Sequence, residues 1–106
     1  MLEETEMVKH VILWKLKDDY SGAEIQKIKA EIKEGLEGLK GEIPGLIEIQ
    51  VNTEPLRSSN CDLMLDSLFE DEAALKGYAD HPKHVFVANT RVRPFTASRV
   101  CMDYEV

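Results

Sequence analysis

The sequence lacks any run of apolar residues that approaches the roughly 20 needed to cross a membrane. Its N-terminus, "MLEETEM", is acidic and has no basic segment followed by an apolar one, as a secretory signal would. Internal repeats, low-complexity segments and linkers rich in Pro, Gly or Ser are also missing. These absences predict a cytoplasmic protein without a membrane partner.

Positive charge is scarce, because 13 Lys and Arg residues stand against 20 Asp and Glu, giving a net charge of −7. A phosphate backbone would be repelled by this average charge. The most closely spaced arginines, Arg91, Arg93 and Arg99, are interrupted by Pro94 and do not predict a basic patch. We therefore expect no nucleic-acid partner.

The chain has only two cysteines, Cys61 and Cys101. Their spacing matches neither a zinc site nor a C-x-x-C redox pair. We expect both thiols to be reduced and to pack as small hydrophobic side chains.

Motifs for common cofactors are absent as well. The sequence has no nucleophile elbow, no Gly-rich phosphate loop and no dinucleotide fingerprint, so we expect no cofactor. The histidines His10, His81 and His84 lack the close carboxylates or thiols that would make them a metal site. We therefore predict no metal held by side chains.

The length of 106 residues predicts one small domain. The periodicity of its apolar residues predicts elements in the order β-α-β-β-α-β, which is that of an α+β ferredoxin-like fold with a four-stranded antiparallel sheet and helices on one face. Strands are expected at 8–17, 46–51, 63–69 and 95–106, and helices at 21–39, at 70–79 and from 82 to just before Pro94.

Local signals support the helix boundaries. "SGAE" at 21–24 is a capping box, in which the Ser21 hydroxyl accepts from the Glu24 amide and the Glu24 side chain reaches back. Gly41 and Pro44 end this helix. The acidic run that begins at Glu70 is explained by the start of the next helix, where negative charge is favourable.

The first strand carries apolar residues on both of its faces. Alternation places His10, Ile12 and Trp14 on one face, while Val11 and Leu13 lie on the other between lysines. Helices can cover only one face, and a bare apolar sheet invites association. We therefore predict a homodimer in which two sheets pack face to face as an α/β barrel.

The segment "YADHPKH" at 78–84 is the main candidate for chemistry. Pro82 suits the first position of a helix, which places His81 at its N-cap. Tyr78 and His84 flank this junction, and their polar ends can meet in one space. A phenol and an imidazole can perform acid–base work there, although their spacing alone favours a structural role.

His10 is the one strongly polar side chain on its face of the first strand. It is explained either as a hydrogen-bonded core histidine or as a residue that lines a cavity. Trp14 on the same face is expected to pack in the core and beside that cavity. Arg99 can reach an anionic ligand, but a surface ion pair explains it as well.

Four stretches together resemble the stress-responsive A/B barrel (Dabb) domain family. They are "MVKHVILWKLKD" at 7–18, "IPGL" at 43–46, "FEDEAALKGYADHPKHV" at 69–85 and "RVCMDYEV" at 99–106. The resemblance covers 7–106, which leaves 1–6 as an N-terminal extension. It implies a ferredoxin-like fold that dimerises into an α/β barrel.

The family resemblance also implies functions. Most bacterial members have no assigned activity, whereas a plant branch similar to olivetolic acid cyclase closes a linear polyketide without a cofactor. Carried over by motif, His84 would be the base, Tyr78 the orienting group and His10 a pocket residue. The further tyrosine and histidine of that cyclase pocket correspond here to Leu36 and Leu63, which makes the pocket more apolar.

Two functional hypotheses follow. The first is a dimeric barrel, connected with stress, that binds a small apolar or polyketide-like ligand in a pocket containing His10, Trp14 and Leu63. The alternative is a cofactor-independent enzyme, cyclase-like or monooxygenase-like, that uses His84 and Tyr78. Some plant relatives also hold a cation on backbone carbonyls, and the corresponding stretch here includes Lys40, Ile43 and Leu46.

Overall fold

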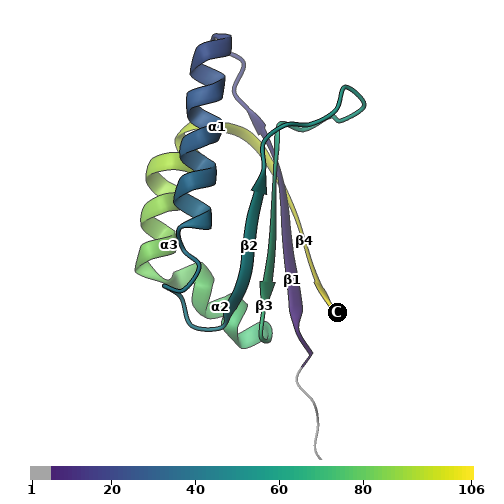
Figure 1. Ribbon diagram of the computed structural model, residues 1–106, viewed down its shortest axis with the longest axis vertical. Helices are drawn as coiled ribbons and strands as arrows, with labels where there is room; N and C mark the ends of the chain where they lie inside the picture. The colour runs from purple at the N-terminus through teal and green to yellow at the C-terminus, as the bar shows by residue number, and fades with distance from the viewer. Residues whose placement is uncertain (1–5) are drawn as a thin grey trace, which may run out of the picture.

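The computed structural model describes residues 6–106, so most of the expected extension at 1–6 lies outside the described residues. The chain folds in the predicted order of strands and helices (Figure 1). The strands are β1 (Val8–Leu16), β2 (Leu46–Asn52), β3 (Leu63–Phe69) and β4 (Thr96–Glu105). The helices are α1 (Gly22–Glu37), α2 (Glu72–Asp80) and α3 (Pro82–Val87), followed by the short turns η1 (Ala88–Val92) and η2 (Arg93–Phe95).

The four strands form one antiparallel sheet in the order β2-β3-β1-β4, and all three helices lie on one side of it (Figure 1). The sequence prediction of an α+β ferredoxin-like fold is therefore confirmed. None of the described helices combines the length and the apolar character that a membrane crossing requires.

Helix α1 begins at the predicted capping box. The Ser21 hydroxyl accepts from the Glu24 amide at 3.2 Å, and the Glu24 carboxylate accepts from the Ser21 amide at 3.0 Å. The helix buries Ile28, Ile32 and Leu36 against the sheet. Burial of such a side chain is worth about 1.5–3 kcal/mol, which holds the helix in place.

The connection from α2 to β4 is less regular than the sequence predicted. His81 ends α2 and also caps α3, where its ring nitrogen accepts from the Lys83 amide at 3.1 Å, so its predicted capping role is confirmed. The helix that was expected to continue to Pro94 instead widens into a π-helical turn at η1 and tightens into a 3-10 turn at η2. Pro94 lies in that last turn, where it cannot supply an amide donor.

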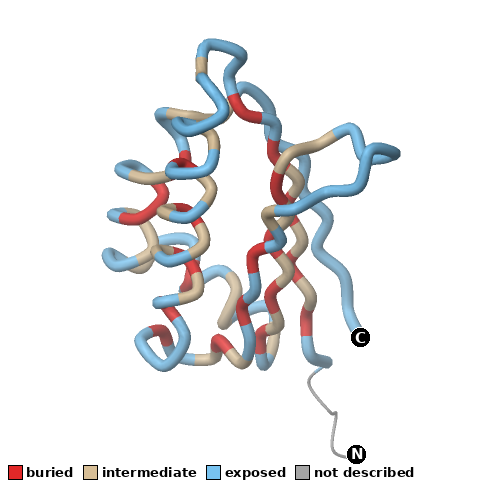
Figure 2. Tube along the Cα trace, turned by 45° about the horizontal axis from the view of Figure 1, so that its top comes forward, coloured by how far each residue is buried: buried red, intermediate tan, exposed pale blue. Residues whose placement is uncertain are grey.

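Strand β4 differs from the other strands because the helices leave it uncovered. Buried residues concentrate where the helices face β1, β2 and β3, whereas β4 is exposed along nearly its whole length (Figure 2). The expectation that both cysteines pack as small hydrophobic residues is therefore wrong. Cys101 on β4 is exposed and Cys61 is half-buried, although both are free thiols as expected.

Candidate functional site

A cavity of about 180 Å³ lies between the sheet and the helices. Its walls come from β1, β3, α1, α2, α3, the turns η1 and η2, and the start of β4. Its lining is mainly apolar, with a few polar groups that include His10, Tyr78, His84 and Arg99. An apolar cavity with a small number of convergent polar groups is the usual form of a small-molecule site.

Tyr78 is the most deeply buried polar side chain of this cavity. Its ring packs edge-on against Phe69, with centroids 4.9 Å apart, and the residue is only 1% exposed. Among the described residues, the Tyr78 hydroxyl is the one buried side-chain N or O atom without a hydrogen-bond partner. Burial raises the pKa of Tyr78 well above its usual range, although Arg99 opposes this shift, so the phenol remains a neutral donor.

His84 lies beside Tyr78, with ring centroids 4.1 Å apart. Its Nδ1 is 3.2 Å from the carbonyl oxygen of Ala79 and donates to it, which leaves Nε2 as the ring atom with a free lone pair. Burial is the largest cause that lowers the pKa of His84, and the hydrogen bond to Ala79 opposes it. The positive charges of Arg93 and Arg99 lower this pKa further. The imidazole is thus neutral at neutral pH and able to accept a proton.

His10 contributes the third polar group from β1. It is 7% exposed, and its ring centroid lies 6.1 Å from that of Tyr78. Its Nδ1 is 2.5 Å from Asp103 Oδ1 on β4, the residue directly opposite it in the strand pairing. Asp103 was not selected from the sequence. The one signal for it was the alternation along "RVCMDYEV", which places Arg99 and Asp103 on the same face of the strand.

The structure brings together most, but not all, of the predicted site residues. Trp14 lines the cavity and also belongs to the core, as expected. Leu63 is buried in the core but does not line this cavity, whereas Leu36 does. Arg99 lines the cavity.

The predicted backbone cation site falls in the turns between α1 and β2. There the Ile43 carbonyl accepts from the Leu46 amide at 3.2 Å, and the Gly45 carbonyl accepts from the Glu70 amide at 2.9 Å. These carbonyls thus have protein partners, and the cation site near Lys40 stays a prediction.

A wider groove of about 760 Å³ lies between α2 and β4 and adjoins the cavity. Four residues line both spaces: His10, Leu75, Ala79 and Arg99. The groove therefore provides the approach to Tyr78 and His84 from solvent. Because β4 has no helix above it, this approach stays open in the isolated chain.

The polar groups of the cavity suit a ligand with a carbonyl or anionic oxygen. Tyr78 supplies a neutral hydroxyl donor, Arg99 a positive charge and His84 a neutral imidazole. These are the groups that stabilise an oxygen atom and accept a proton in acid–base chemistry.

Fold and cavity together define a class of small α+β ferredoxin-like proteins with a ligand-sized space between sheet and helices. The chain belongs to the stress responsive A/B barrel domain (Dabb) family, whose model matches residues 8–106. The family resemblance seen in the sequence is thereby confirmed.

Several solved structures have a similar fold. A dimeric protein of unknown function with a ferredoxin-like fold from Bacteroides fragilis is 33% identical, with a TM-score of 0.87 and coverage of 94% of this chain and 96% of that one. A Dabb family protein from Mesorhizobium loti is 22% identical, with a TM-score of 0.72 and coverage of 94% and 96%. A hydroxynitrile lyase from Passiflora edulis is 20% identical, with a TM-score of 0.72 and coverage of 95% and 94%. No curated protein matches the chain.

The lowered pKa of His84 leads to a prediction about acid stability. A histidine whose pKa is lower in the folded than in the unfolded chain stabilises the fold above its unfolded pKa, and this contribution is lost as the pH falls through the folded pKa. We expect His84 to titrate below 6.5 in an NMR titration of the folded protein. We also expect His84→Asn, whose amide can replace the donor to Ala79, to lose less thermal stability than the wild type on acidification below about pH 6.5. A titration midpoint at or above 6.5, or equal losses in the two proteins, would contradict this prediction.

Proposed function

We propose that this protein is a dimeric barrel that binds a small molecule with a carbonyl or anionic oxygen in the cavity of Tyr78, His84 and Arg99. The observation that carries the proposal is the Tyr78 hydroxyl, a buried donor without a partner among the described residues. A buried donor without an acceptor costs about 1–3 kcal/mol. A ligand oxygen at this hydroxyl removes that cost, and Arg99 favours an oxygen with negative charge.

The size of the cavity limits the ligand. Its 180 Å³ corresponds to about six water molecules at the volume each occupies in the liquid. An apolar cavity of roughly 150 Å³ is large enough to hold benzene. A molecule with one ring or a short chain therefore fits, whereas a longer, polyketide-like ligand would have to extend into the groove between α2 and β4.

A second candidate function is cofactor-independent acid–base catalysis at the same site, and the state of His84 favours it. The ring is neutral, lies against Tyr78 and has Nε2 free to take a proton from an acidic C–H or O–H group. Tyr78 would hold the oxygen that gains negative charge. A hydroxynitrile lyase from Passiflora edulis has a similar fold, so this fold can carry an enzyme activity.

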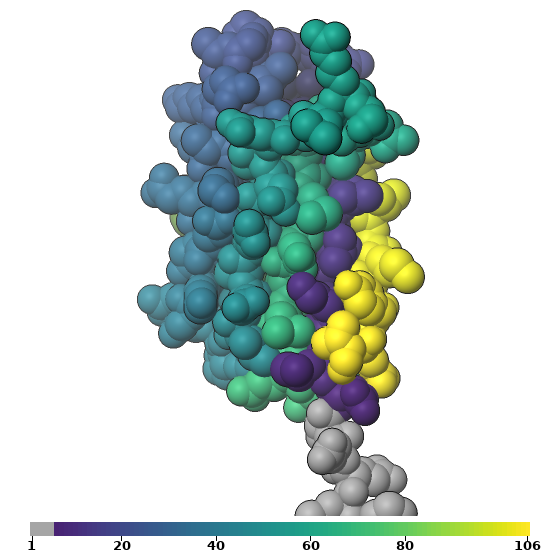
Figure 3. All heavy atoms as spheres, turned by 45° about the vertical axis from the view of Figure 1, so that its right-hand side comes forward, coloured from purple at the N-terminus to yellow at the C-terminus, as the bar shows by residue number. Residues whose placement is uncertain are grey.

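The dimer is proposed from the outer face of the sheet, which the helices do not cover (Figure 3). Two cross-strand pairs in the middle of this face are apolar, Val11 opposite Met102 and Leu13 opposite Val100. Met102 is 67% exposed and Val100 is 61% exposed in the isolated chain. A second copy would cover this surface sheet to sheet, and similar ferredoxin-like proteins are described as dimeric.

The ligand proposal can be tested with three ring compounds of similar size. Benzoate and benzaldehyde carry the required oxygen and toluene lacks it. We expect benzoate and benzaldehyde to raise the melting temperature of the wild type more than toluene does. Tyr78→Phe should remove this difference. Its free energy of unfolding should equal that of the wild type or exceed it by up to about 1 kcal/mol, because the substitution deletes a buried hydroxyl that has no partner among the described residues. Unchanged binding of benzoate and benzaldehyde to Tyr78→Phe, or no stabilisation of the wild type by any probe, would refute the proposal.

Catalysis requires a separate measurement, because a ligand can bind without reacting. We expect the wild type to accelerate exchange of the acidic protons of acetylacetone in deuterated water, followed by NMR. His84→Asn should lower this acceleration by about 100-fold or more, as for loss of a general base. The matched control is His81→Asn, since His81 caps α3 and does not line the cavity. Equal exchange with the wild type and His84→Asn would exclude His84 as the base.

The dimer proposal predicts that substitutions of two equally exposed apolar residues have different effects on the dimer dissociation constant. Met102 on the outer sheet face is 67% exposed, and Phe86 on α3 is 66% exposed. Sedimentation should give the wild type twice the chain mass of 12.0 kDa. Met102→Lys should raise the dimer dissociation constant by about tenfold or more, equivalent to about 1.4 kcal/mol, whereas Phe86→Lys should leave it unchanged. A monomeric wild type at micromolar concentration would disprove the sheet-to-sheet dimer.

A further inference from the structure

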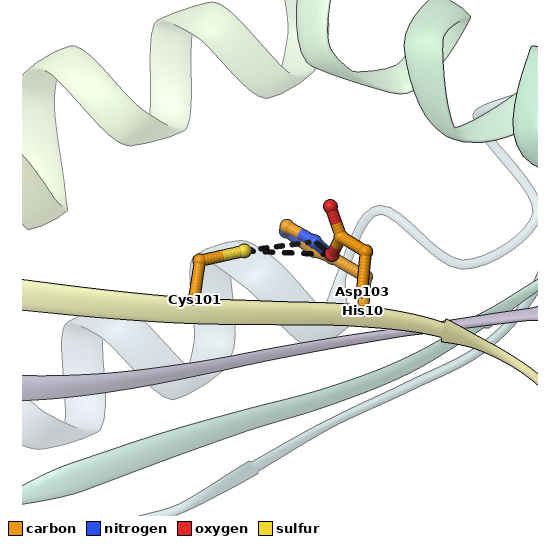
Figure 4. Close-up of side chains that lie close together, drawn as sticks. All are labelled: His10, Cys101 and Asp103. Carbon is orange, nitrogen blue, oxygen red and sulfur yellow. Dashed lines mark hydrogen bonds and ion pairs between the residues drawn. The ribbon is translucent and has the colours of Figure 1, made fainter.

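Three side chains of different chemistry meet at the floor of the groove between α2 and β4 (Figure 4). His10 comes from β1, and Cys101 and Asp103 come from β4, all on the side of the sheet that faces the helices. Asp103 lies directly opposite His10 in the strand pairing, and Cys101 is two residues earlier on the same face. The sheet register therefore fixes all three positions.

The three donor atoms gather around one point. His10 Nδ1 is 2.5 Å from Asp103 Oδ1 and 3.7 Å from Cys101 Sγ, and Sγ is 3.4 Å from Asp103 Oδ1. A thiol–imidazole–carboxylate triad for nucleophilic catalysis would place the thiol and the carboxylate on opposite ring nitrogens. Here both approach the same nitrogen, an arrangement that serves a shared metal ion rather than a proton relay.

We propose that His10, Cys101 and Asp103 form a binding site for a borderline-soft divalent cation of the zinc type. A tetrahedral zinc ion places its N, O and S ligands about 3.3–3.6 Å from one another. The two distances to Cys101 Sγ, 3.7 Å and 3.4 Å, are close to these values. Only the distance between His10 and Asp103 must open, by a little less than 1 Å. Asp103 can make this movement because its side chain is 45% exposed.

The chemistry of the three ligand atoms indicates which class of metal ion would bind. One imidazole nitrogen, one thiolate and one carboxylate oxygen are typical of zinc, whereas calcium and magnesium prefer oxygen alone. Three protein ligands leave a fourth position, which faces the groove and would hold water or a ligand atom. Glu72 and Glu105 also line the groove and favour a cation, while Lys76 and Arg99 oppose it.

Binding requires a defined proton arrangement. His10 must coordinate through Nδ1, so its remaining proton lies on Nε2, and the Cys101 thiol must release its proton to solvent. The thiolate and the carboxylate then balance the two charges of the ion. Because His10 lines both the groove and the cavity, the ion would sit at the approach to Tyr78 and would fix the tautomer of His10 there.

The test uses Co²⁺, which reports thiolate coordination by a charge-transfer absorption in the near ultraviolet, and calorimetry with Zn²⁺. We expect one Zn²⁺ per chain and the cobalt thiolate band in the wild-type protein. Cys101→Ser should abolish the band, and Cys101→Ser and Asp103→Asn should each weaken Zn²⁺ binding by about tenfold or more. Both residues are exposed, so these variants are expected to fold. Cys61→Ser is the matched control, because it removes the other thiol and should keep the band and the affinity.

Three outcomes would overturn the proposal. They are no Zn²⁺ binding by the wild type, a cobalt band that survives Cys101→Ser, and a band that Cys61→Ser removes. The result is separable from the proposed ligand site, since Cys101 and Asp103 line the groove but not the cavity. Binding of benzoate to the metal-free protein should therefore be the same in Cys101→Ser and in the wild type.

Discussion

The pairing of β1 with β3 on one side and β4 on the other is the constraint on which the rest of this structure depends. It directs His10, Ile12 and Trp14 toward the helices and leaves Val11 and Leu13 on the outer face. A slip of one residue would exchange the two sets, because side chains alternate along a strand. The buried core excludes such a slip, so it also fixes the position of His10 beside the cavity and opposite Asp103.

The uneven cover of the sheet determines where ligands and partners can approach. Three helices cover β1, β2 and β3 on one face and leave β4 free, which opens the groove beside α2 (Figure 2). None of the described helices covers the opposite face of the sheet in the single chain (Figure 3). The same shortage of helices therefore creates both the approach to the cavity and the surface proposed for a second copy.

Desolvation controls the chemistry of the cavity more than any single ion pair does. It is the largest cause of the raised pKa of Tyr78 and of the lowered pKa of His84. Both shifts favour neutral groups, so the cavity offers a hydrogen-bond donor and a proton acceptor without burying two charges. Arg99 supplies the positive charge at the edge of the cavity, where it is exposed and well solvated.

Local pattern in the sequence determined the elements of this protein. Alternation of apolar residues located the four strands. The capping box at Ser21 gave the start of α1, and Pro82 with His81 gave the start of α3. Motif resemblance identified the family and selected Tyr78, His84 and His10, which do share a cavity. Each of these conclusions rests on residues close together in the chain or on a motif that can be read directly.

Only the tertiary structure decided which distant residues meet. His10 and Asp103 are separated by 93 positions, and their contact depends on the register between the first and last strands. Local pattern also could not show the exposure of Cys101 or the position of Leu63 outside the cavity, nor that the Tyr78 hydroxyl has no partner among the described residues. Register and burial arise from the packing of the whole domain, so no short stretch of sequence contains them.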